Sequence, residues 1–256
     1  MAVDTGKNID LQWDGDVARL TLTRADKLNP LDWDTVRELK GAVAEIDARQ
    51  DVFAVVVTGR GRSFSAGGDL DGYLTLYRHP DRFAAFLDDF YSMLVAIEAS
   101  PKIYIAAVNG VCVAGGMDLI LHCDVVVASD QARFRVPELL RGIPDPHMSA
   151  RLTQVVGLQR ARFLFFTADE IDAHEAAAMG LVGKVVPHAE LDAEVERILG
   201  MIALTGPTAR TMVKRDLNTG LPPHSTQMFV DSFGSPEMVE GMRAFLEKRP
   251  AEWPRG

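Results

Sequence analysis

Three carboxylic acids near the middle of the chain, Asp118, Glu138 and Asp145, are the residues best suited to acid/base chemistry. Asp118 lies about one helical turn after Gly115 and Gly116, in an apolar stretch where an unpaired acid is costly. Burial in a mostly apolar pocket raises the pKa of a carboxyl group, so that it can exchange protons with carbon near neutral pH. We therefore take these three residues as catalytic candidates.

The second and third acids each have a structural explanation as well. Glu138 follows Pro137 and could begin a helix, where a negative charge is favourable. Asp145 is enclosed by two prolines, and turn chemistry explains it equally well. Among the histidines, His147 is close to these acids in sequence, whereas His122 lies in an apolar helix and is expected to be a core residue.

Two glycine-rich turns, within residues 62–70 and 107–119, follow apolar strands. A backbone that approaches a ligand closely needs residues without a bulky Cβ, and two convergent N–H groups can stabilise a developing oxyanion. Taken singly, each Gly-Gly pair could equally be a tight connection. The first turn does not complete a Gly-x-Ser-x-Gly motif, so Ser63 and Ser65 are predicted to be turn residues and not nucleophiles.

Both turns resemble the paired oxyanion-hole segments of the enoyl-CoA hydratase/isomerase family, also called the crotonase superfamily, whose members process acyl-CoA thioesters. The resemblance continues, in the order and spacing of the family, through residues 20–31, 124–128, 134–139, 173–187 and 240–249. It therefore covers nearly the whole chain. It implies an acyl-CoA enzyme that stabilises an enolate-like intermediate.

The resemblance also implies roles for individual positions. The N–H groups of Gly68 and Gly115 would hold the thioester oxygen, and Glu138 would be the principal acid/base. Coenzyme A would be part of the substrate, so no separate cofactor is expected. The CoA-binding positions of the family correspond here to Lys27, Leu28, Ala66, Phe229, Phe245 and Lys248.

The acid positions leave the reaction subtype open. Hydratases of the family have Glu at both positions, so that the pair grips a water, whereas this chain has Asp118 and then Glu138. This pair, with Asp145 nearby, is similar to dienoyl-CoA isomerase, although the third acid of that enzyme lies one residue further from the Glu. We expect double-bond isomerisation first, hydration of a 2-enoyl-CoA as the alternative, and a non-catalytic acyl-CoA-binding paralogue as the third interpretation.

Composition narrows the class of protein further. The 256 residues, 47% of them hydrophobic, can bury a substantial core, and the net charge of −9 disfavours a nucleic-acid surface. No apolar run is long enough to span a membrane, and the N-terminus, with Asp4 and Lys7, is too polar for a signal peptide. We expect a cytoplasmic protein with no membrane partner and no metal site, and reduced thiols at Cys112 and Cys123.

The hydrophobic pattern predicts an α/β fold, which the resemblance specifies as a crotonase-like spiral of ββα units. Strands are predicted at residues 17–23, 52–58 and 102–108. Asp32 is predicted to cap a helix through about Ile46, and Asp81 to begin a second helix. The apolar face of that second helix comprises Phe83, Phe86, Leu87, Phe90, Leu94 and Ile97. The segment from Tyr73 to Asp89 is expected to shape the acyl pocket.

Residues 1–190 are predicted to form the core with the acyl-CoA site, and residues 191–256 a helical trimerisation region. Breaks at Gly206-Pro207 and at residues 221–224 divide this tail into about three helices. The tail has apolar stripes but too little chain to enclose them, so it should pack against a neighbouring subunit. The residues expected to be buried between subunits of a homotrimer, or of a hexamer of two trimers, are Phe229, Phe233, Met242, Phe245 and Leu246.

Overall fold

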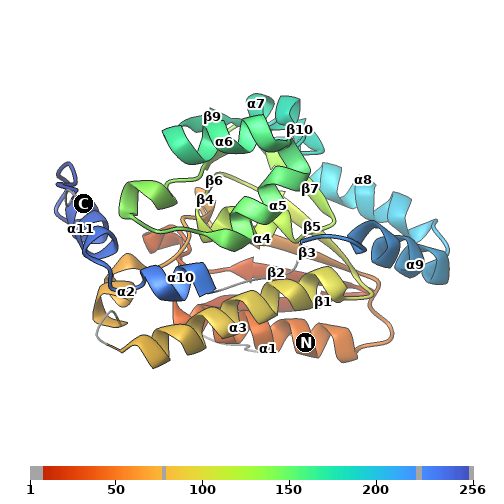
Figure 1. The fold of residues 1–256 in the computed structure, drawn as a ribbon. Helices are drawn as coiled ribbons and strands as arrows, with labels where there is room; N and C mark the ends of the chain where they lie inside the picture. The colour runs from red at the N-terminus through yellow and green to blue at the C-terminus, as the bar shows by residue number, and fades with distance from the viewer. Residues whose placement is uncertain (1–7, 77–78, 223–226, 254–256) are drawn as a thin grey trace.

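A six-stranded sheet in the order β1-β2-β3-β5-β7-β10 forms the centre of the protein (Figure 1). Our computed structural model describes residues 8–76, 79–222 and 227–253. β1 pairs with β2 in antiparallel register, and the other pairs are parallel. The strands are β1 (Ile9–Asp14), β2 (Val17–Leu22), β3 (Ala54–Gly59), β5 (Ile103–Val108), β7 (Val125–Ser129) and β10 (Lys184–Val186).

A smaller sheet in the order β4-β6-β8-β9 continues from the larger one. Its strands β4, β6 and β8 are parallel, and they follow within a few residues after β3, β5 and β7 of the larger sheet. The fourth strand, β9, pairs antiparallel with β8. This repetition confirms the predicted ββα units and brings the two glycine turns, after β4 and β6, to neighbouring positions. The strands are β4 (Ser63–Ser65), β6 (Val111–Val113), β8 (Arg133–Arg135) and β9 (Glu170–Asp172).

Both faces of the larger sheet are covered, as the near-continuous apolar strands require. One face packs against α1 (Trp33–Ala48) and α3 (Pro80–Ala99), which lie side by side beneath the sheet in Figure 1. The other face packs against α8 (Leu191–Ala203). The predicted N-cap is confirmed, since the Asp32 carboxylate accepts a hydrogen bond from the Thr35 N–H at 2.9 Å. The six predicted apolar residues of α3 are all buried.

Shorter helices connect the strands and surround the end of the smaller sheet. Those before the C-terminal region are η1 (Ala25–Lys27), α2 (Leu70–Leu76), α4 (Gly115–Leu121), η2 (Glu138–Arg141), α5 (Pro146–Val156), α6 (Leu158–Thr167), α7 (Ala173–Met179) and η3 (His188–Glu190). Among the described residues, no helix has both the length and the apolar character needed to cross a bilayer.

The C-terminal region is helical, as predicted, but its described residues form four helices and not three. After α8 come α9 (Pro207–Asn218), α10 (Gln227–Ser232) and α11 (Pro236–Leu246). The additional break precedes α11. Ser235 is the N-cap of this helix, and its side chain accepts a hydrogen bond from the Met238 N–H at 3.2 Å. Part of the predicted break at 221–224 lies outside the described residues, as do Asp4 and Lys7 of the polar N-terminus. The domain boundary at 190/191 coincides with the start of α8 and stays a prediction.

The prediction that Phe229 and Met242 are buried between subunits is wrong, whereas Phe245 and Leu246 are 52% and 37% exposed in the single chain and their burial between subunits stays a prediction. Phe229 and Met242 are 4% and 0% exposed within the single chain and belong to its main core. Phe233 stacks on Phe83 of α3, with ring centroids 3.3 Å apart. α11 contacts α2 and η2, far from α8 and α9 (Figure 1). Apolar periodicity identifies a helix face that needs burial, but it does not identify the surface that buries it.

Candidate active site

The two glycine turns pack directly against each other. Gly67 has a φ of 85°, and a Cβ at this position would lie 2.5 Å from Ala114 Cβ and 2.9 Å from the Gly115 nitrogen. Only glycine fits both the conformation and the space. Ala114 itself has a φ of 54°, a conformation that non-glycine residues adopt mainly where the surroundings enforce it. The fold therefore fixes the backbone of both turns.

The N–H groups of Gly68 and Gly115 donate no hydrogen bond within the described part of the chain. In the first turn, the Leu31 N–H donates a hydrogen bond to the Gly67 carbonyl at 2.8 Å. This backbone pairing does not use the Gly68 N–H. Gly115 is the first residue of α4, where a helix has no internal acceptor. Both residues line one cavity. Two fixed and unpaired N–H donors of this kind can bind a negatively charged oxygen.

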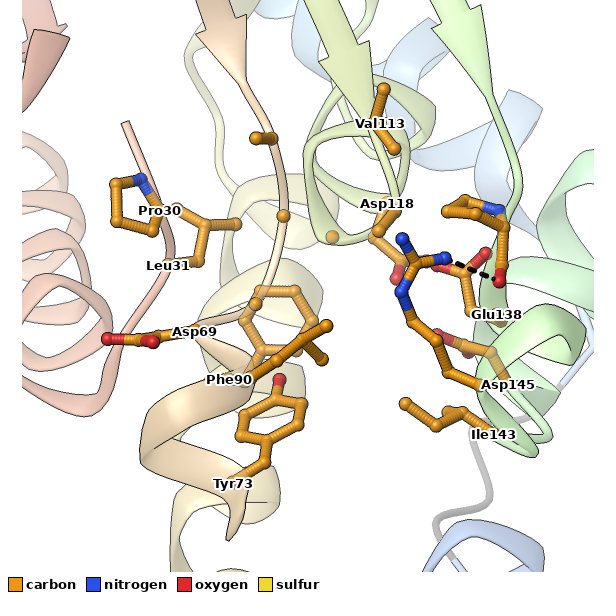
Figure 2. A pocket seen from close by; sticks show the side chains of 18 of the residues that line it. Pro30, Leu31, Asp69, Tyr73, Phe90, Val113, Asp118, Glu138, Ile143 and Asp145 are labelled. Atoms are coloured by element: carbon orange, nitrogen blue, oxygen red, sulfur yellow. Dashed lines mark hydrogen bonds between the residues drawn. The ribbon is translucent and has the colours of Figure 1, made fainter. Parts of the chain in front are cut away.

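This cavity has a volume of about 330 Å³ and holds all three acids that the sequence analysis selected (Figure 2). Asp118 comes from α4, Glu138 begins η2, and Asp145 is the N-cap of α5. Their exposed fractions are 1%, 5% and 8%. Among the described residues, no group of His, Cys, Asp and Glu side chains has the geometry of a metal site.

Asp118 and Asp145 form a buried acid pair. Burial and the neighbouring charges of Asp145 and Glu138 raise the pKa of Asp118 well above its usual value. Burial also raises the pKa of Asp145, opposed by the hydrogen bond that it accepts from the Met148 N–H at 2.9 Å. Both carboxylate oxygens of Asp118 are buried without a hydrogen-bond partner among the described residues, which favours its neutral form. The hydrogen bonds to Asp145 favour the charged form of that acid instead.

Glu138 lies beside this pair on the same side of the cavity and is the strongest candidate for a proton donor (Figure 2). Burial, together with the charge of Asp145, raises its pKa to about 8. Its Oε2 atom is buried and accepts no hydrogen bond from the described residues. The carboxyl group is consequently neutral at pH 7, and its proton can be transferred to a ligand in the cavity.

The two histidines near the acids have structural roles. His147 is 1% exposed and stacks on Tyr91 with ring centroids 3.6 Å apart. The Tyr91 hydroxyl in turn donates to Asp145 at 3.4 Å. His122 is a core residue, as predicted: its Nδ1 lies 2.7 Å from the Asp118 carbonyl oxygen.

Four of the six predicted CoA-binding residues line the same cavity. Lys27, Ala66, Phe229 and Phe245 line it, whereas Leu28 and Lys248 do not. The Leu28 carbonyl accepts a hydrogen bond from the Ala66 N–H at 2.9 Å, which places it directly beside the rim. Lys248 is exposed. The residues that line the cavity are therefore the better candidates for CoA contact.

Two residues that line the cavity were missed as individual site residues. Arg141 donates a hydrogen bond to the Pro137 carbonyl at 2.8 Å, and its guanidinium lies 4.1 Å from the centre of the Phe245 ring. It is three residues after Glu138, and residues at this spacing share a face of a 3₁₀ helix, so the spacing could have identified it. Tyr73 was predicted only as the start of a pocket-shaping segment.

Comparison with known proteins agrees with this geometry. The sequence model described as enoyl-CoA hydratase/isomerase matches residues 13–256. The chain belongs to this family, the crotonase superfamily. The members act on acyl-CoA thioesters, so the protein is an enzyme of this class and the interpretation as a non-catalytic paralogue loses its support.

Similar proteins span the whole length of this crotonase-family chain. It is 34% identical to the short-chain-enoyl-CoA hydratase of Clostridium acetobutylicum, over 96% of this chain and 97% of that one. It is 37% identical to the crotonyl-CoA hydratase of Syntrophomonas wolfei, over 96% and 98% of the two chains. The crystal structure of an enoyl-CoA hydratase from Bacillus anthracis superimposes with a TM-score of 0.79 at 28% identity, covering 96% and 99% of the chains.

Proposed function

We propose that the protein hydrates a 2-enoyl-CoA thioester. The observation that carries the proposal is that Glu138, with its raised pKa, and the acids Asp118 and Asp145 share one cavity with the free N–H groups of Gly68 and Gly115. The names of the relatives, all of them hydratases among those compared above, favour hydration over the isomerisation that the acid positions suggested first.

The proposed reaction uses these groups in separate roles. The N–H groups of Gly68 and Gly115 polarise the thioester carbonyl and stabilise the enolate-like intermediate. The charged acid pair takes a proton from water as the water oxygen attacks Cβ of the substrate. Glu138 gives its own proton to Cα of the substrate. The pair gains one proton and Glu138 loses one, so a single proton transfer restores the starting state.

A direct assay tests the proposal. The protein is incubated in heavy water with 2-enoyl-CoAs of increasing chain length, and the products are analysed by mass spectrometry and NMR. We expect 3-hydroxyacyl-CoA that carries one deuterium at Cα. Deuterium uptake or a shifted double bond without hydrated product would contradict hydration.

Isomerisation remains the second candidate because the cavity contains three acids, whereas hydration needs one base and one proton donor, so that Asp118 could serve as the base without Asp145. Asp145→Asn separates the two reactions. Asparagine still caps a helix, so α5 should be retained, and Asp118 would then supply the charged carboxylate alone. We expect hydration to fall less than about 10-fold and any isomerisation of dienoyl-CoA to fall about 100-fold or more, because positioned acid/base groups contribute this much.

The matched control for Asp145→Asn is Asp172→Asn. Asp172 is also a helix N-cap, accepting a hydrogen bond from the Glu175 N–H at 2.9 Å, but it ends β9 and caps α7 outside the cavity. This variant should leave both rates unchanged. Equal losses of hydration and isomerisation in Asp145→Asn, with the control intact, would show that the third acid does not distinguish the reactions.

We also propose that the enzyme is a homo-oligomer, a trimer or a hexamer of two trimers. Large apolar side chains are exposed on α6, on α9 and directly after α8, including Phe166 (75%), Leu204 (88%), Met212 (63%) and Leu217 (74%). Such a surface is unfavourable in a monomer. The most exposed side chains thus lie in and beside these helices. The sequence analysis predicted the interface within residues 191–256, and of the residues that it named there, Phe245 and Leu246 are also exposed.

Leu204→Glu combined with Leu217→Glu should shift the protein to monomers, because a buried interface does not accept two unpaired carboxylates. Light scattering at micromolar concentration measures the change. Met228→Glu is the control, since Met228 is also exposed (57%) but lies on α10. Dissociation by Met228→Glu and not by the double variant would reverse the assignment of the interface.

A further inference from the structure

Tyr73 is held in the cavity by an aromatic cluster. It lies on α2, the helix that follows Gly68 and Asp69, and its ring makes edge contact with Phe83 at a centroid distance of 5.5 Å. Phe86 packs against it at the same centroid distance. Figure 2 shows its hydroxyl pointing from α2 toward Phe90, on the other side of the cavity from the three acids. These contacts leave the ring little freedom to move.

The hydroxyl of Tyr73 touches the oxyanion-hole residue Gly68. A Cβ added to Gly68 would lie 2.3 Å from the hydroxyl oxygen and 2.7 Å from Cζ, both shorter than any normal contact. Tyr73 can therefore occupy this place only because residue 68 is glycine. The phenol therefore lies beside the residue whose N–H is proposed to bind the thioester oxygen.

This hydroxyl is a donor without an acceptor. It makes no hydrogen bond within the described ranges of the chain, although it faces a cavity of mostly apolar lining. Burial and the charges of Asp145, Asp118 and Glu138 raise the pKa of Tyr73 above its usual value, so the phenol keeps its proton throughout the neutral range. A fixed polar group with no partner in the protein is explained when it binds a ligand atom.

We propose that Tyr73 is a catalytic residue whose hydroxyl donates a third hydrogen bond to the thioester oxygen held by the N–H groups of Gly68 and Gly115. Tyrosine hydroxyls serve as oxyanion donors in other enzymes. A phenol also suits this site because it is neutral: a cationic donor here would form ion pairs with the neighbouring acids and hold them in their charged forms.

The spectroscopic test uses Tyr73→Phe and butyryl-CoA labelled with ¹³C at the thioester carbonyl. Difference infrared spectra record the carbonyl stretch of the bound ligand. We expect wild-type protein to shift this band to lower frequency than in solution, because three donors polarise the bond. In Tyr73→Phe the band should move part of the way back toward its solution frequency. The variant should still bind butyryl-CoA. A saturated ligand is used because it reports hydrogen bonding without turnover.

The kinetic test rests on the proposed hydration. Tyr73→Phe should lower kcat by about 10²-fold with little change in KM, as expected for a donor that acts mainly in the transition state. Tyr104→Phe is the matched control, since the Tyr104 hydroxyl is also buried but lies outside the cavity. It should change neither the carbonyl band nor kcat. Melting temperatures of both variants check the fold.

The two tests fail in distinguishable ways. If the protein hydrates no 2-enoyl-CoA, the carbonyl band still reports on Tyr73, and only the proposed function is lost. If Tyr73→Phe leaves the band at its wild-type frequency, the hydroxyl does not reach the thioester oxygen and the inference is overturned. A faster Tyr73→Phe enzyme would also overturn it, because it would show that the hydroxyl obstructs the oxyanion hole.

Discussion

Glu138→Gln should reduce turnover by about 10²–10⁴-fold while acyl-CoA binding stays nearly intact. The amide keeps the size and shape of the side chain but cannot deliver a proton to carbon. Steady-state kinetics and calorimetric titration with a saturated acyl-CoA measure the two quantities. Glu45→Gln, at an exposed position of α1, is the control and should behave as wild type. Activity within a few-fold of wild type in Glu138→Gln would remove this residue from the mechanism.

The same substitution should change how activity and stability depend on pH. Glu138 has an ordinary pKa of 4.5 and a folded-state pKa of about 8, so its protonated form stabilises the folded state. This contribution is complete below pH 4.5 and is lost as the pH rises to about 8. Wild-type hydration should accordingly decline above pH 8.

Glu138→Gln should melt at a higher temperature than wild type above pH 8, because it buries no charge there. Near pH 4.5 the melting temperatures of the two proteins should be similar. Thermal denaturation at a series of pH values measures the difference. A difference independent of pH would show that the Glu138 carboxyl is not held neutral by burial.

Gly115→Pro should lower the rate by about 10²–10³-fold, because proline removes one of the N–H groups that face the thioester oxygen. Proline is tolerated at the first position of a helix, which is the place of Gly115 in α4. No metal or cofactor should restore the activity. The carbonyl stretch of bound butyryl-CoA should also move toward its solution frequency.

Circular dichroism decides whether Gly115→Pro is folded, since proline also restricts Ala114, the residue before it. Gly115→Ala keeps the N–H and provides the comparison. Its added Cβ would lie 3.3 Å from Leu31 Cδ1, the end of a flexible side chain that can adjust. A folded Gly115→Pro enzyme with ordinary rates would show that the oxygen is held elsewhere.

The sequence by itself determined the local features of this protein. The Asp32 cap, the apolar face of α3 and the glycine turns each depend on neighbouring residues or on a helical repeat, and all three are present in the structure. The acids Asp118 and Glu138 were identified in the same way, from an apolar segment and a family-like context. Local backbone preference and hydrophobic periodicity depend on residues that are close in sequence, so they can be predicted without the rest of the chain.

Only the tertiary structure decided which groups meet through space. It placed Asp145 beside Asp118, so that the charge of one acid raises the pKa of the other, and it placed the Tyr73 hydroxyl against Gly68. It also packed Phe229 and Met242 into the core of their own chain. Each of these contacts links elements whose relative positions follow from the packing of the whole molecule. A helix face or a buried carboxyl shows in the sequence that it needs a partner, but the identity of that partner depends on the three-dimensional fold.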